Sequence, residues 1–76
     1  MEHGQQVDVE LVGEFVELNQ LLKLAGVVDS GGAGKHLVAE GVVQVDGQPE
    51  LRKTCKIRAG QIVTLGDVVI RVLAKP

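Results

Sequence analysis

Aromatic residues are almost absent from this 76-residue chain, which has one Phe, no Trp and no Tyr. A core must therefore be filled by Leu, Val and Ile. Stacking of single-stranded nucleic acid is not favoured, because it uses aromatic platforms. A chain this short buries only about 60% of its unfolded surface, which suffices for one domain. We expect a single domain over residues 1–76, with a modest aliphatic core.

Cysteine and long apolar runs are scarce as well. Cys55 is the single cysteine, which excludes an internal disulfide and a multi-cysteine metal site. No apolar run approaches the roughly 20 residues that a membrane-spanning helix needs. The polar first ten residues do not read as a secretion signal, which has positive charge followed by an apolar region. We expect a cytoplasmic protein with no metal, no cofactor and no membrane contact.

Residues that could carry catalysis are few. Lys53 and Lys56 flank Cys55 and could lower the pKa of its thiol, but no His or acid is placed by the sequence to act as its base. We therefore expect a half-buried structural thiol at Cys55. The Gly34-Lys35 pair is similar to the end of a phosphate-binding loop. That motif needs Gly at position 29 and Ser or Thr at position 36, where this chain has Asp29 and His36. We expect no enzymatic activity.

Lys and Arg are missing from the first 17 positions, which hold five acids. The rest of the chain has all eight basic residues against five acids, a surplus of three positive charges in a chain of net charge −2. Four cations fall within seven residues: Arg52, Lys53, Lys56 and Arg58. A local positive potential can therefore coexist with an overall negative charge. Such a cluster is a candidate for phosphate contacts.

Hydrophobic spacing predicts two short helices. The first runs from about residue 16 to a stop at Gly26, because apolar residues recur at helical spacing at Leu18, Leu21, Leu22 and Ala25. The second begins after an N-cap at Ser30 or Asp29 and ends at Gly41, where a positive φ is expected. Its apolar stripe is predicted to consist of Ala33, Leu37 and Val38, with Lys35 and His36 pointing elsewhere.

Alternating apolar residues predict strands on both sides of the helices. Residues 1–6 are expected to form a flexible tail, followed by a strand over residues 7–11. After the helices, a strand at residues 43–45 leads into an Asp46-Gly47 hairpin turn, and further extended segments follow to the end of the chain. The predicted class is α+β, with two packed helices against a small, mostly antiparallel sheet of four or five strands.

These motifs occur in the order of a known family. They are GKHLV at residues 34–38, EG at 40–41 and VQVDG at 43–47, with LNQLLKL upstream and IRAGQIV downstream. In that order the chain resembles the S4 RNA-binding domain, over about residues 17–65, and is most similar to small stand-alone bacterial S4-like proteins. The resemblance implies an S4-like, αL-type fold and RNA binding.

The resemblance also implies a binding face. In S4 domains the positions of Lys35 and His36 are basic and contact RNA, and we add the cluster at residues 52–58. The candidate RNA-binding residues are Lys35, His36, Arg52, Lys53, Lys56 and Arg58. The family often has basic residues where this chain has Val42, Gln44 and Gln48, which thins the positive face.

The expected function is non-catalytic binding of structured RNA, such as ribosomal or transfer RNA, by a monomer. Recognition by shape and backbone contact fits a chain that is poor in aromatic residues. The alternative is a protein–protein interaction module without nucleic-acid binding, which would use the acidic N-terminal segment and an edge of the sheet.

Overall fold

The computed structural model describes residues 4–75, in which two helices pack beside a mostly antiparallel sheet. The main sheet has five strands in the order β1-β7-β6-β3-β4. Their bounds are β1 Gln5–Leu11, β3 Val43–Val45, β4 Gln48–Pro49, β6 Ile62–Leu65 and β7 Val68–Ala74. A separate two-stranded sheet pairs β2 (Val16–Glu17) with β5 (Lys56–Ile57). The predicted α+β class is confirmed.

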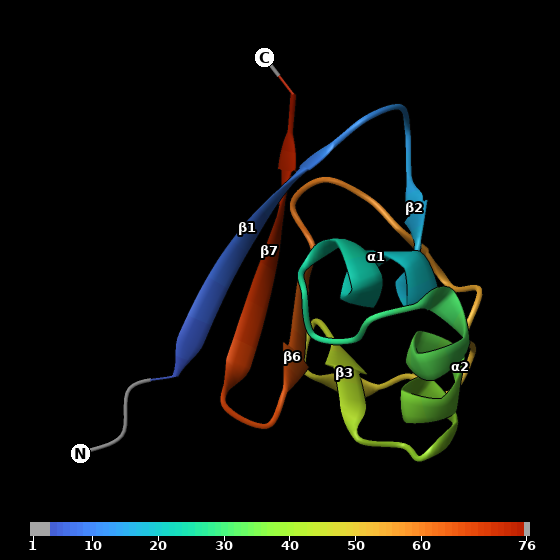
Figure 1. The fold of residues 1–76 in the computed structure, drawn as a ribbon. Helices are drawn as coiled ribbons and strands as arrows, with labels where there is room; N and C mark the ends of the chain where they lie inside the picture. Colours follow the sequence, from blue (N-terminus) through green and yellow to red (C-terminus); the bar gives the residue numbers. More distant parts are fainter. Residues whose placement is uncertain (1–3, 76) are drawn as a thin grey trace.

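The first and last strands lie side by side, although they come from opposite ends of the chain (Figure 1). They run parallel, whereas the other strand pairs in the described residues are antiparallel. The register places Asp8 opposite Arg71, and the Arg71 Nε lies 3.0 Å from the Asp8 Oδ1. Alternate residues point inward, so Ile70 and Val72 are buried while Arg71 is exposed.

The flexible tail predicted over residues 1–6 is wrong at Gln5 and Gln6. Both are strand residues, paired with Val68 and Val69 of β7. Main-chain hydrogen bonding to β7 accounts for this, because it does not depend on apolar side chains. Residues 1–3 lie outside the described residues.

The two helices are α1 (Leu18–Leu24) and α2 (Gly31–Ala39), and they lie side by side near β3 and β6 (Figure 1). α1 buries three leucines completely: Leu18, Leu21 and Leu22. These leucines belong to one aliphatic core with Val38 of α2 and with Val43, Ile57, Val63 and Ile70 from four strands. Neither helix in the described part of the chain is long and apolar enough to cross a membrane.

The buried face of α2 differs from the predicted stripe. Val38 is buried and Leu37 is half-buried as expected, but Ala33 is exposed and Gly34 is buried instead. A Cβ built on Gly34 would lie only 2.7 Å from the main-chain oxygen of Asn19 in α1. The absence of a side chain therefore lets the two helix backbones approach closely, which hydrophobic periodicity does not reveal.

The predicted caps and hairpin turn are confirmed. The Ser30 Oγ accepts a hydrogen bond of 3.1 Å from the Ala33 amide and caps α2. Gly41 has a φ of +81°, the left-handed conformation expected after a helix. Asp46 and Gly47 have φ values of +51° and +84°, and they join β3 to the two-residue edge strand β4.

Two glycines on α2 provide a matched test of this packing. We expect Gly34→Ala to lower the free energy of unfolding by about 1–3 kcal/mol, since its methyl group would strike main chain that cannot rotate away. Gly32→Ala should leave stability unchanged or raise it by up to about 1 kcal/mol, because the nearest atom to its Cβ would be the Ser30 Oγ at 3.9 Å. Urea denaturation measures both, and equal midpoints would contradict the close approach of the helices.

Candidate functional site

Main-chain hydrogen bonds hold the loop that carries Lys53 against the start of α1. The Leu18 amide donates to the Cys55 oxygen at 2.9 Å, and the Asn19 amide donates to the Lys53 oxygen at 3.1 Å. Amides in the first turn of a helix have no acceptor within that helix. The Glu17 side chain, at the N-cap position, bonds to none of them in the described structure. The loop thus caps α1, which gives it a defined position.

The start of α2 meets the same end of α1. Gly34 packs on Asn19, whose amide is bonded to Lys53, so Asn19 links the α2 segment to the basic loop. Successive residues of an α-helix are rotated by about 100°. Lys35 therefore flanks the face that touches α1, whereas His36 is turned away from it, and both side chains are exposed. The Asn19 contact thus joins the segment that carries Lys35 to the loop that carries Lys53.

Lys56 and Arg58 lie beside Phe15, the single aromatic residue. In the β2–β5 ladder Val16 is opposite Ile57, and both contribute to the core. Neighbouring residues on each strand point outward, because side chains alternate across a strand. The Lys56 Nζ is 5.0 Å from the centre of the Phe15 ring, and the Arg58 Cζ is 5.8 Å from it. Both distances are those of cation–π contacts.

Phe15 was not among the candidate site residues predicted from the sequence. It is 38% exposed, although Phe is usually a core residue. The sequence position of Phe15 could have indicated its exposure. Phe15 comes one residue before Val16, and its side chain points outward if a strand begins at Val16. The two-residue strand β2 falls inside the helix start predicted from about residue 16, so this alternation was not recognised.

The main chain at Arg58 is held by a polar network from the hairpin turn. The Arg58 amide donates to the Gln61 Oε1 at 2.7 Å, and the Gln61 Nε2 donates to the Asp46 Oδ2 at 3.1 Å. The Asp46 Oδ1 accepts from the Ile62 amide at 3.0 Å, and this bond lowers the pKa of the Asp46 carboxyl. The turn residue Asp46 therefore helps to orient a cationic residue of the site.

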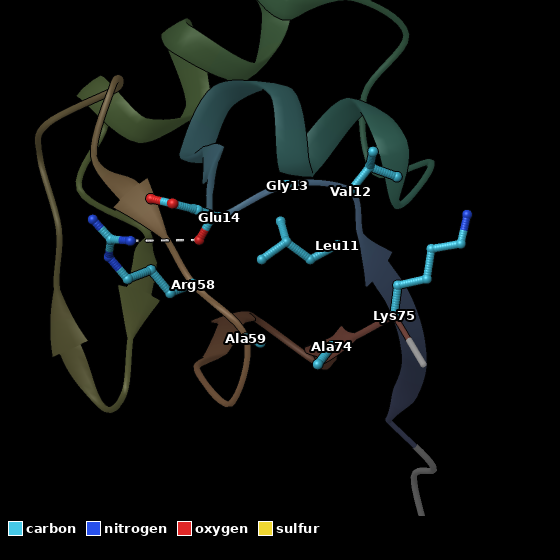
Figure 2. Close-up of a pocket in the computed structure, with 8 residues that line it drawn as sticks. All are labelled: Leu11, Val12, Gly13, Glu14, Arg58, Ala59, Ala74 and Lys75. Atoms are coloured by element: carbon cyan, nitrogen blue, oxygen red, sulfur yellow. Dashed lines mark hydrogen bonds between the residues drawn. The ribbon is translucent and has the colours of Figure 1, made fainter.

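The Arg58 guanidinium borders an open surface hollow of about 510 Å³, whose floor includes the buried Leu11. Figure 2 shows Arg58 reaching from one side toward the Glu14 carbonyl oxygen, with its Nη1 3.5 Å from that oxygen. Lys75 lies on the opposite side of the hollow and points away from Arg58 (Figure 2). Lys75 is therefore across this hollow from Arg58.

Arg52 forms a salt bridge with the carboxylate of Glu50. Its Nε is 2.9 Å from the Glu50 Oε2, and its Nη2 is 3.2 Å from the Glu50 Oε1. The Arg52 amide also donates to the Glu50 Oε2, at 2.9 Å. These bonds lower the pKa of Glu50 to about 2. Glu50 is thus ionised at neutral pH and offsets the charge of Arg52.

The half-buried thiol expected at Cys55 is confirmed, and the pKa lowering that the flanking lysines would allow is absent. The thiol is half-buried, and its burial and the nearby Glu50 carboxylate raise its pKa. A raised pKa reduces the thiolate fraction that a nucleophile requires. Within residues 4–75, no three His, Cys, Asp or Glu side chains form a group that could hold a metal ion.

Comparison with known proteins identifies the family. The S4 domain model matches residues 9–73. YbcJ of Escherichia coli (strain K12) is 51% identical over 59 residues, which cover 78% of this chain and 84% of YbcJ. The Bacillus subtilis (strain 168) protein named Probable ribosome maturation protein RlbA is 38% identical over 52 residues, which cover 68% of this chain and 73% of that relative.

A solved structure agrees with this assignment. The solution structure of YbcJ from E. coli, which reveals an αL motif involved in RNA binding, superposes with a TM-score of 0.64 at 40% sequence identity. The alignment covers 97% of this chain and 92% of YbcJ. The chain belongs to the S4 domain family. The resemblance inferred from the sequence motifs is confirmed.

The Arg52–Glu50 pair makes a prediction about acid stability. The pKa of Glu50 falls from 4.5 to about 2 on folding, so its ionised form stabilises the fold fully above pH 4.5, and this contribution is lost as the pH falls toward 2. Glu50→Gln should be less stable than the native chain at neutral pH and should lose less further stability on acidification. Arg52→Gln should flatten the pH dependence similarly. Urea midpoints at neutral pH and at about pH 3 measure this, and parallel losses in all three proteins would contradict it.

Proposed function

We propose that this chain binds structured RNA, without catalysing a reaction on it, through phosphate contacts from one basic face. The contributing residues are Lys35, His36, Arg52, Lys53, Lys56 and Arg58. The observation that carries the proposal is that Asn19 makes two main-chain contacts. Its carbonyl oxygen lies against Gly34, and its amide donates a hydrogen bond to the Lys53 oxygen. Asn19 joins two cationic segments that are distant in sequence, and phosphate contacts from both would fix the orientation of the protein on the RNA.

The family and its members support RNA as the partner. E. coli YbcJ, 51% identical to this chain, has an αL motif involved in RNA binding, and the B. subtilis relative is named for ribosome maturation. We infer ribosomal or transfer RNA as the partner, bound by a monomer in the cytoplasm. RNA duplexes are recognised largely by shape and by phosphate and 2′-hydroxyl contacts, which suits exposed cations on a fold with a single aromatic residue.

The six residues should contribute unequally. Lys35 and Lys53 flank the shared contact on Asn19, and we expect them to matter most. Arg52 should contribute less, because Glu50 offsets its charge. His36 should contribute least, since it faces away from α1.

The salt dependence of binding tests the electrostatic mechanism. Four or five phosphate contacts give a slope of log affinity against log salt of about −3 to −4.5. Neutralising two contacts with Lys53→Gln and Lys56→Gln should reduce the steepness of that slope by about 1.5 and weaken binding at low salt. Fluorescence anisotropy of a labelled RNA hairpin at several potassium concentrations measures both effects.

Lys23→Gln with Lys75→Gln is the matched control, because it removes the same charge. Lys23 lies in the last turn of α1, away from the capped end, and Lys75 points away from Arg58. Arg71 is unsuitable because it is bonded to Asp8. The control should leave the slope nearly unchanged. Equal losses from both double variants would indicate diffuse attraction, and absence of salt-dependent RNA binding would favour the protein–protein interaction module.

A further inference from the structure

The surroundings of Phe15 are unlike those of a core aromatic residue. Its ring is partly exposed, and two cations contact it from β5 and from the residue after β5. Two other exposed apolar residues, Val12 (78% exposed) and Leu24 (63% exposed), line a small hollow of about 120 Å³ together with Phe15. An apolar surface beside paired cations is complementary to a nucleotide, which joins a flat apolar base to an anionic phosphate.

We propose that Phe15, Lys56 and Arg58 form a subsite for one unpaired nucleotide of the RNA. This inference rests on the proposed function and specifies a structural feature of its RNA. The base stacks on the Phe15 ring, which suits any of the four bases because each has a π-face. The Lys56 ammonium, on a flexible four-carbon side chain, moves from the ring to a phosphate next to that base.

The subsite is held by main-chain structure on both sides. The β2–β5 pairing fixes the main chain directly after Phe15 and at Lys56, and Gln61 with Asp46 holds the Arg58 main chain. A site fixed before binding loses little entropy when the ligand arrives. One aromatic residue accommodates one base, so the subsite suits a bulged or looped-out nucleotide beside a duplex and not a long single strand. The scarcity of aromatic residues argues against stacking along a single strand, and one stacked nucleotide does not require it.

The experiment compares two RNA hairpins that differ by one bulged nucleotide, together with a third in which the bulge is abasic. Stacking of one base gives roughly a 5- to 100-fold gain in affinity. The native chain should therefore prefer the bulged hairpin to the fully paired and abasic ones by about that factor. Phe15→Leu should abolish the preference, and Phe15→Tyr should retain it. Ile62→Ala, which alters a side chain that is similarly exposed (41%) on another strand, should keep the preference.

A fluorescent variant gives a direct readout. Because the chain has no Trp or Tyr, Phe15→Trp carries a single indole whose emission should be quenched by the bulged hairpin and not by the abasic one. This result does not depend on whether Phe15→Leu folds, which circular dichroism checks.

The outcomes separate the two proposals. Equal affinity of the native chain for the bulged, paired and abasic hairpins would overturn the subsite and leave phosphate binding intact. Binding to none of the three would overturn both. A preference that survives Phe15→Leu in the folded protein would assign the extra nucleotide to another surface.

Discussion

The contact between α1 and α2 at Asn19 is the constraint on which the candidate site depends. Gly34 lies so close to the Asn19 main chain that an added Cβ would sit 2.7 Å from its oxygen. The amide of the same residue is bonded to Lys53 in the loop before β5. Asn19 itself is buried at 1% exposure. One position therefore sets the separation of the helices and the place of the basic loop, and the proposed cationic face rests on both.

Carboxylates offset the charge of two arginines in this acidic protein. Asp8 is bonded to Arg71 across the β1–β7 pair, and Glu50 is bonded to Arg52 beside the α1 cap. An exposed ion pair such as Asp8–Arg71 contributes little to stability, but both pairs reduce the positive potential near an arginine. Lys35 and Lys53 belong to the two segments that Asn19 joins, while Lys56 and Arg58 lie against Phe15. Total charge is a poor guide to such a surface, because potential depends on local arrangement.

Local chemistry accounts for the features that could be predicted from the sequence. Helical spacing identified α1, Ser30 was one of two candidate caps of α2, Gly41 was recognised as a position with positive φ, and Asp46-Gly47 was recognised as a hairpin turn. Each depends on residues within about four positions, so no knowledge of the fold is needed. The α+β class followed from the order of these elements, and the S4 domain family followed from motifs that the same elements carry. The sequence also identified the cationic residues, though not their surroundings.

Contacts between distant segments decided the rest. Hydrophobicity favoured Ala33 for the buried face of α2, but Gly34 occupies it because two backbones approach there. Gln5 and Gln6 joined β1 through main-chain bonds to β7. Phe15 lies beside Lys56 and Arg58 because β2 pairs with β5, which is some 40 residues further along the chain. By itself the sequence determined the elements, their caps and the residues that carry charge. The tertiary structure alone decided which charges are offset and which share a face, because both depend on the distance between residues far apart in the chain.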